Sequence, residues 1–478
     1  MGNKVLFIGL DGASFNILMP WIGKGFLPML KRLIEKGAYS ILKSTIPPDT
    51  PPAWASIFTG KNPGKHGVYG FLELTPQLDE KSNEYLFRVV NSRCRKSPAI
   101  WNILSKEGKR VIVINAPLTY PPESVNGVMI SGFLTPSLMS SFVYPRWLKP
   151  MLVKKGYRIG VRFGEEEFSM QNLVENIRAR VRIAKWLMRN FDWDLFIIVF
   201  METDHVMHIH NDIRKALKIY QEVDNGISTL IKESSSKSYV VLVSDHGFKK
   251  FKRNFYLNTF LWKRGLLKLK INGAYLYSKL LTNLTYTSID NALNISLVRK
   301  FKDFFFRAAG SKTLGSSSNL IDYANSFCYN LLSGTSFSTM RFNVKHREPA
   351  GILNKSSYNY LLKYLADELK KTGIVKNVLT KDKIYWGPFL ENAPDLIVQA
   401  RGEYLIKQML MPLTSIPLNT YDHFMNGIFI AYIPNMERKG RLDGNISVMD
   451  VTPTILELLD LKIPLDMDGQ AVKGLTEL

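Results

Sequence analysis

The sequence predicts an α/β fold built on a mostly parallel central sheet. Strands are expected at four apolar runs, residues 4–10, 110–115, 195–200 and 239–243. These runs lack the alternation of a half-exposed strand, so both of their faces should be covered, as in a parallel sheet. Helical patterns lie between the runs and give the chain the alternation of βα units. No run of about 18 apolar residues indicates a membrane span.

The first part of the chain follows this alternation in order. The opening strand ends at Asp11 and, because its apolar run stops there, it is interpreted as a buried strand and not as a signal peptide. Helices are predicted at 27–37, 50–60, 98–108, 168–191 and 212–232, with a turn at 62–68.

The alternation breaks at residues 249–340, which are aromatic, basic and rich in Ser and Asn. We interpret this segment as an insertion or cap, and residues 1–248 and 341–478 as one catalytic core. Clear helix and strand patterns resume after this segment. They predict a helix at 355–371, a strand at 396–398, a strand following His423 and a final helix at 451–459.

The composition is strongly basic. Lys and Arg outnumber Asp and Glu by 63 to 41, a net charge of +22. Residues 249–312 carry 14 basic side chains against two acidic ones, which is more than half of this excess. Such a charge favours an anionic partner: a phosphorylated substrate, an acidic membrane surface or nucleic acid. The two cysteines, Cys94 and Cys328, provide no disulfide framework, so a reducing, cytoplasmic setting is expected.

Acidic and histidine side chains gather where the predicted strands end. Ligands in open α/β sheets bind beyond the carboxyl ends of the strands. The side chains concerned are Asp11, Asp204, His208, Asp245, His246 and His423, with His423 expected in a loop before a further strand. They divide into two sets of three, Asp11/Asp245/His246 and Asp204/His208/His423, which suit two Zn²⁺ or Mn²⁺ ions.

Thr50 is the candidate nucleophile. It is expected to cap a helix that continues through Pro51, where unpaired N–H groups and the helix dipole favour a phosphate. A threonine hydroxyl is weak at neutral pH, but two metal ions can lower its pKa and stabilise a leaving oxygen. Thr50 would complete such a site.

Five segments together resemble the type I phosphodiesterase/nucleotide pyrophosphatase family of the alkaline phosphatase superfamily. They are Phe7–Gly12, Thr50–Gly60, Asp204–His208, Ser244–Gly247 and His423–Ala431. The resemblance implies an alkaline-phosphatase-like three-layer sandwich with an inserted cap. It also implies a phospho-enzyme on Thr50, one metal on Asp11, Thr50, Asp245 and His246, and a second on Asp204, His208 and His423. The metal is usually zinc in that family.

The expected activity is metal-dependent hydrolysis of a phosphodiester or pyrophosphate bond through a phospho-threonine. One alternative is a phosphoryl or phospho-alcohol transferase with the same site. Another is a non-catalytic binder of anionic lipid or nucleic acid, although no nucleic-acid motif predicts specific readout. Peripheral contact with an acidic membrane surface is expected for this charge.

One position departs from the family. Its nucleotide pyrophosphatases carry an asparagine shortly after the His-Gly that follows the nucleophile helix. Counting from His66 and Gly67, that position is Phe71 here. The sequence therefore does not predict the nucleotide substrate that is typical of the family. Asn115 or a basic cap residue is the candidate to take the place of the missing asparagine.

Overall fold

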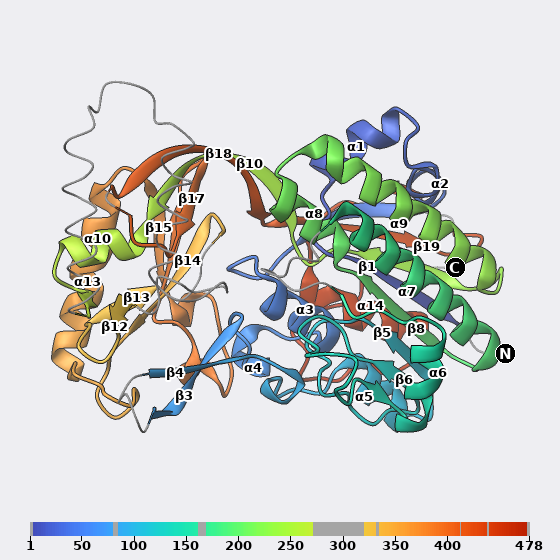
Figure 1. The fold of residues 1–478 in the computed structure, drawn as a ribbon, viewed down its shortest axis with the longest axis horizontal. Coiled ribbons are helices and arrows are strands. Elements are labelled where there is room, and N and C mark those ends of the chain that lie inside the picture. The colour runs from blue at the N-terminus through green and yellow to red at the C-terminus, as the bar shows by residue number, and fades with distance from the viewer. Residues whose placement is uncertain are drawn as a thin grey trace.

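The computed structural model describes residues 3–79, 85–160, 169–270, 320–330, 334–411, 413–436 and 439–475. Figure 1 shows two lobes, one built on a large sheet covered by helices and the other built on smaller sheets. The two long strands β10 Gly247–Tyr256 and β18 Ser415–Phe424 run between the lobes. Most of the basic segment 249–312 lies outside the described residues. None of the helices in the described ranges is both long and apolar enough to cross a membrane.

The central sheet has ten strands in the order β20-β2-β19-β9-β1-β8-β5-β6-β7, with β21 also paired to β2. Its pairs are parallel except for those of β19 with β2 and β9, and of β6 with β7. The strands are β1 Val5–Leu10, β2 Ala38–Lys43, β5 Val111–Ile114, β6 Gly127–Ile130, β7 Val143–Tyr144, β8 Leu195–Phe200, β9 Tyr239–Val243, β19 Asn426–Tyr432, β20 Gly440–Arg441 and β21 Ile446–Ser447.

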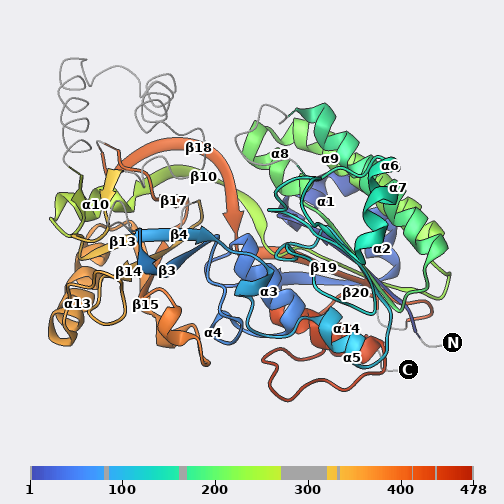
Figure 2. The same cartoon turned by 60° about the horizontal axis from the view of Figure 1, so that its bottom comes forward.

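Helices cover both faces of this sheet, which makes the lobe a three-layer sandwich. Leu6 and Ile8 of β1 pack in one core with α1 Phe15–Gly23, α2 Pro28–Lys36, α7 Met170–Asn190 and α9 Ile213–Glu233. Val5 and Phe7 pack in the other with α3 Thr50–Thr59, α5 Ile100–Lys106 and α14 Val451–Leu458. Figure 2 shows α3, α5 and α14 together on one side of the sheet. Because every residue of β1 meets a core, its sequence is apolar throughout.

The second lobe has its own apolar core around Phe255, Tyr329 and Leu396. Its elements are β3 Leu72–Leu78, β4 Tyr85–Val89, β10 Gly247–Tyr256, α10 Leu257–Lys263, β11 Lys268–Leu269, β12 Ile321–Asp322, β13 Cys328–Asn330, β14 Phe337–Phe342, α13 Lys355–Lys371, β15 Val375–Thr380, β16 Leu396–Ala400, β17 Tyr404–Lys407 and β18 Ser415–Phe424. They form the sheets β17-β10-β18, β13-β14-β16-β15, β11-β12 and β3-β4.

The strand pairing bears on the expected domain boundaries. The junction expected between residues 340 and 341 falls inside β14, and β14 pairs with β13 and β16 in one sheet. The strands β15, β16, β17 and β18 also pair in the sheets of the second lobe, and the chain returns to the central sheet at β19. The hairpin β3-β4 also packs on the core of that lobe through Tyr85.

Three local expectations are corrected. The helix at Thr50 is present, but Asp49 is its N-cap and Thr50 is its first residue. The turn expected at 62–68 contains the short helix α4 Pro63–His66. His423 lies inside β18 and not in a loop, because β18 runs unbroken from the second lobe to the edge of the central sheet.

Candidate two-metal centre

Three buried aspartates meet at the carboxyl edge of the central sheet. Asp11 follows β1 directly, Asp245 lies two residues beyond β9, and Asp204 lies in the first turn of α8 Glu202–His210, just after β8. These three side chains are at most 3% exposed. One oxygen of each carboxylate accepts no hydrogen bond: Oδ1 of Asp11, Oδ1 of Asp204 and Oδ2 of Asp245. Burying a carboxylate oxygen without a hydrogen-bond donor costs free energy, and bound cations would offset that cost.

Neighbouring N–H groups donate hydrogen bonds to the other carboxylate oxygens of Asp11 and Asp245. The indole Nε1 of Trp54 donates to Oδ2 of Asp11 at 2.6 Å, and the backbone N–H of Gly12 donates to Oδ1 of Asp245 at 3.2 Å. Trp54 approaches so closely because Gly9 has no side chain: a Cβ there would lie 2.4 Å from the Trp54 ring. The glycine in β1 thus permits the contact that orients the first aspartate.

His246 completes the first set of three. Its Nε2 lies 3.7 Å from Oδ1 of Asp11 and 3.3 Å from Oδ2 of Asp245. The two oxygens are those that lack hydrogen bonds. The three residues present one ligand atom each within 4.8 Å of one another. The structure therefore brings together the set Asp11/Asp245/His246 that the sequence predicted.

Asp204, His208 and His423 form the second set. Oδ1 of Asp204 lies 3.2 Å from Nε2 of His208 and 3.3 Å from Nε2 of His423. The two imidazole Nε2 atoms are 2.8 Å apart. All three residues therefore point a ligand atom at one small volume. The ring of His423 also stacks on that of His246 with centroids 3.8 Å apart, so the two sets are adjacent.

The pKa shifts show why these groups need positive charge between them. Burial raises the pKa of Asp11 well above its usual range, and repulsion by Asp245 and Asp204 raises it further. Burial likewise raises the pKa of Asp245. Burial also disfavours the charged form of Asp204, but the neighbouring His208 and His423 hold its pKa well below its usual range. Divalent cations would remove the repulsion and keep all the carboxylates ionised.

Asp422 is a buried acid beside the centre that the sequence reasoning missed. It groups with His208 and His423 at ligand distance. Its Oδ2 accepts from Nζ of Lys407 at 2.8 Å, and its Oδ1 accepts from the backbone N–H of His423 at 3.0 Å. Because both oxygens have donors, Asp422 supports His423 more readily than it ligates a metal. The Asp-His pair at 422–423 repeats the pair at 245–246, and that repetition could have revealed it.

Thr50 faces the first set of ligands. Its Oγ1 lies 3.3 Å from Nε2 of His246, and the residue is 3% exposed. The helix beneath it differs from expectation in one respect. Pro51 and Pro52 have no N–H, and the N–H of Ala53 already donates to the carbonyl of Asp49 at 3.1 Å. The N-terminus of α3 therefore offers a phosphate at most the N–H of Thr50.

Two residues considered at the phosphate position have other roles here. The Phe71 ring packs edge to face on Phe133, with centroids 6.1 Å apart. Asn115 lies just after β5, and its amide nitrogen donates to the carbonyl of Val199 at 2.8 Å.

His66 is buried in α4, where its Nε2 lies 3.0 Å from Oγ of Ser56. His66 therefore contacts α3 through Ser56, which lies six residues after Thr50.

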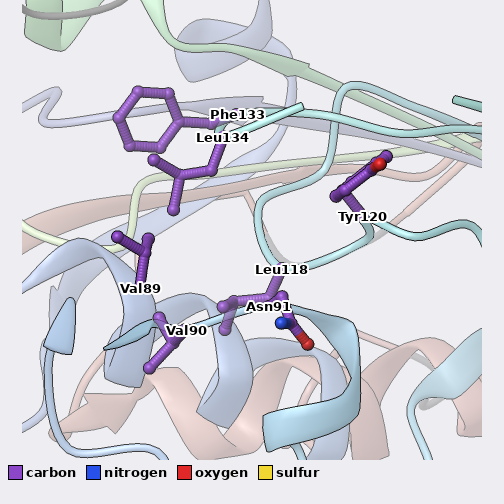
Figure 3. A pocket seen from close by; sticks show the side chains of 7 residues that line it. All are labelled: Val89, Val90, Asn91, Leu118, Tyr120, Phe133 and Leu134. Atoms are coloured by element: carbon purple, nitrogen blue, oxygen red, sulfur yellow. The ribbon is translucent and has the colours of Figure 1, made fainter. Parts of the chain in front are cut away.

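A mainly apolar pocket borders the centre (Figure 3). Its volume is about 170 Å³, and it is lined by Val89, Val90, Asn91, Leu118, Tyr120, Phe133 and Leu134. Val90 and Leu118 pack with Ala55 of α3, one turn beyond Thr50. On the other side Phe133 packs on the ring of His205, the neighbour of Asp204, with centroids 5.6 Å apart. The pocket is therefore flanked by α3, which carries Thr50, and by α8, which carries Asp204 and His208.

Comparisons with known proteins agree with this geometry. Residues 5–426 match the sequence model of the family described as type I phosphodiesterase / nucleotide pyrophosphatase. No curated protein matches the chain by sequence.

Solved structures show the same fold at low identity. A phosphonoacetate hydrolase from Sinorhizobium meliloti 1021, in complex with phosphonoformate, has a TM-score of 0.61 and 17% identity over 96% of this chain and 95% of its own. Human ectonucleotide pyrophosphatase/phosphodiesterase 5 has a TM-score of 0.56 and 12% identity over 98% and 97%. An inactive threonine-to-alanine variant of the murine protein, in complex with AMP, has a TM-score of 0.55 and 12% identity over 97% and 96%.

Proposed function

The chain belongs to the type I phosphodiesterase/nucleotide pyrophosphatase family, and on that premise we propose that Thr50 is its nucleophile in the hydrolysis of a phosphodiester or pyrophosphate bond. Membership makes the chain a metal-dependent hydrolase of phosphoesters. The proposal adds the nucleophile, the phospho-threonine intermediate and the type of bond. The observation that carries it is the 3.3 Å approach of Thr50 Oγ1 to His246, beside the first set of ligands.

The ligand atoms that lack hydrogen bonds fit two divalent cations. Asp11, Thr50, Asp245 and His246 would hold one, and Asp204, His208 and His423 the other. Three carboxylates with three imidazoles are a donor set for Zn²⁺, with Mn²⁺ as the second candidate. Bound cations would supply Lewis acidity, which lowers the pKa of a hydroxyl and stabilises a departing oxygen.

The chain's own residues would divide the reaction into two steps. Oγ1 of Thr50 attacks the phosphorus and passes its proton to solvent, the bond from phosphorus to the leaving oxygen breaks, and that oxygen takes up a proton from solvent as the phospho-threonine forms. Water then attacks the same phosphorus, the bond from phosphorus to Oγ1 breaks, Oγ1 takes up a proton of that water, and the phosphate product leaves. Oγ1 of Thr50 and Nε2 of His246 are 3.3 Å apart, as two ligands of one cation would be. The pocket beside α3 accepts the organic group of the ester.

Features of the solved relatives support this assignment. The inactive variant of the murine phosphodiesterase has a threonine replaced by alanine. The Sinorhizobium hydrolase binds phosphonoformate, which also carries a tetrahedral phosphorus group. We also propose a cytoplasmic setting, and the free, buried thiols of Cys94 and Cys328 support it.

Replacing Thr50 tests the proposal. Thr50→Ala should lower the turnover of bis-p-nitrophenyl phosphate by about a thousandfold or more because the attacking oxygen is gone. Thr50→Ser should keep part of the activity, and acid quenching should trap a phospho-enzyme in the wild type and in Thr50→Ser only. Metal content should be measured for all three proteins. Full turnover by metal-loaded Thr50→Ala would reject the nucleophile.

A competing alcohol separates hydrolysis from transfer. With glycerol present, a hydrolase releases mainly the phosphate monoester, whereas a transferase forms the glycerol ester. Dominant ester formation would assign the chain to transfer through the same site.

A further inference from the structure

A basic and apolar surface lies at the edge of the central sheet and contains none of the candidate metal ligands. It consists of Leu138, Met139, Trp147, Met151 and Val153 with Arg146, Lys149, Lys154 and Lys155, and we call it the 138–155 patch. Its elements are the loop before β7, the short 3₁₀ helix Arg146–Leu148 and α6 Lys149–Lys154. Figure 1 shows α6 beside β6 at this edge.

The apolar members of the patch are unusually exposed. Met139 is 89% exposed, Trp147 60% and Val153 46%, whereas Leu148 and Leu152 are fully buried. The inner leucines hold the segment on the domain, so the outer side chains are not needed for that packing. Five large apolar side chains exposed within 16 residues mark an interaction site.

Contacts join the parts of the patch into one surface. Nζ of Lys149 donates to the carbonyls of Met139 and Ser140, both at 2.9 Å, which ties the loop to α6. Trp147 stacks on Phe191 with centroids 6.3 Å apart. Further along, Nζ of Lys155 lies 4.7 Å from the centroid of the Trp186 ring.

The charge of this surface has one sign. Residues 124–164 contain six basic side chains and no acidic one. Acidic side chains on the adjoining helices and loops are paired: Glu175 with Arg158, Asp192 with Arg110, and Glu233 with Arg189 and Lys185. In the described part of the chain, Arg146 and Lys154 make no ion pair. The patch therefore presents uncompensated positive charge around exposed Trp and Met.

We propose that the 138–155 patch docks on an anionic lipid bilayer. Indole and methionine side chains enter the interface between headgroups and acyl chains, while lysine and arginine remain with the anionic headgroups. Nucleic acid would pair with the charges but leave the exposed Met139 without an apolar environment. An acidic protein partner with an apolar face would leave the protein unbound to vesicles, an outcome that the vesicle test distinguishes. The loop that carries Leu138 and Met139 begins at Phe133 and Leu134, which line the pocket. Docking would thus bring the pocket close to the membrane surface.

Vesicle binding tests the proposal without any substrate. The zinc-loaded full chain should sediment with vesicles of phosphatidylcholine and phosphatidylglycerol, and much less with phosphatidylcholine alone. Met139→Ser/Trp147→Ser should weaken binding by about tenfold or more because apolar contact is lost. Lys154→Gln/Lys155→Gln should weaken it by about fivefold for each charge removed. Leu465→Ser is the matched control, since Leu465 is 97% exposed but outside the patch.

Fluorescence supplies a second measurement that does not depend on affinity. Brominated lipids should quench the wild type, and Trp147→Phe should remove that quenching while binding persists. Thermal melts and turnover of bis-p-nitrophenyl phosphate should stay unchanged in every variant. Equal binding to both vesicle types overturns the proposal. So does unaltered binding by Met139→Ser/Trp147→Ser, which would assign the lipid contact to another basic surface. Loss of turnover in the wild type would reject the proposed hydrolysis instead.

Discussion

At the scale of single residues, His66 is a histidine that folding keeps neutral. Burial lowers its pKa from 6.5 to about 3, and repulsion by Arg95 adds to the shift. The unfolded chain therefore binds a proton that the native protein excludes. The stability contributed by neutral His66 is complete above pH 6.5 and is lost as the pH falls toward 3.

His66→Asn should remove this penalty. Below pH 6.5, the free energy of unfolding should fall more steeply in the wild type than in the variant, by at most about 1.4 kcal/mol per pH unit. Urea titrations at several pH values measure the difference. His346→Asn, at an exposed histidine, is the control and should leave the wild-type slope unchanged. Parallel curves for the wild type and His66→Asn would contradict the prediction.

A second residue, Lys407, is linked through Asp422 to the candidate ligand His423, and we expect it to control how firmly that histidine is held. Its Nζ pairs with buried Asp422, whose other oxygen accepts the backbone N–H of His423. Lys407→Met should leave that carboxylate unpaired and lower zinc affinity by about 10- to 100-fold. Competition with a chromogenic chelator measures it. The control is Lys252→Met, which breaks the exposed pair with Glu403 in the same sheet; equal affinities of both variants would refute the role of Lys407.

At the scale of elements, helix α3 is a poor phosphate site by itself. Pro51 and Pro52 remove two of the N–H groups that a helix N-terminus normally presents. Inorganic phosphate should therefore bind to the metal-loaded protein and show no measurable binding after chelation. Isothermal titration of both forms tests this, and readdition of Zn²⁺ should restore binding. Similar phosphate affinity in the chelated protein would show that donors outside α3 suffice.

The pocket formed by β4 and the loops after β5 and β6 should select the organic part of the substrate. Leu134→Ser or Val89→Ser should raise the KM for aryl phosphodiesters about tenfold and leave kcat unchanged, because apolar contact is lost equally in the ground and transition states. Val153→Ser is the matched control for Val89→Ser, since the two valines are 46% and 51% exposed. A fall in kcat alone would place these residues with the reacting atoms.

At the scale of the whole molecule, the sequence predicted the structural features that are set by residues close together in the chain. The strands β1, β8 and β9 are apolar on both faces because two helical layers cover them, and such runs are visible without a structure. The same strands deliver Asp11 and Asp245 to one edge of the sheet.

Features that depend on distant partners escaped prediction. His423 was expected in a loop because β18 is mixed in character and becomes a strand through its pairing with β10. The pairing of β14 with β13 and β16 was not predicted, because its partners lie on both sides of it in the chain and one of them is more than 50 residues away. Asp422 acquires its role only through Lys407, which is 15 residues away in sequence.

The two lobes also meet through a contact at the loop between β2 and α3. The hydroxyl of Tyr385 donates to the carbonyl of Ile46 at 2.6 Å, and its ring packs on Tyr69. Tyr385→Phe should lower the free energy of unfolding by about 1 kcal/mol, as measured by urea denaturation. Tyr360→Phe, at a side chain that is 69% exposed, should have no effect. An unchanged midpoint for Tyr385→Phe would mean that this contact adds nothing to stability.

The strands that join the lobes begin and end at candidate metal ligands. β10 starts directly after His246, β18 carries His423 as its penultimate residue, and the two strands pair there. One stretch of backbone therefore joins the lobes and carries both His246 and His423. Insertions in the outer part of the second lobe would leave this stretch in place. A slip of one residue in the pairing of β18 with β10 would instead turn His423 to the opposite face, away from the other candidate ligands.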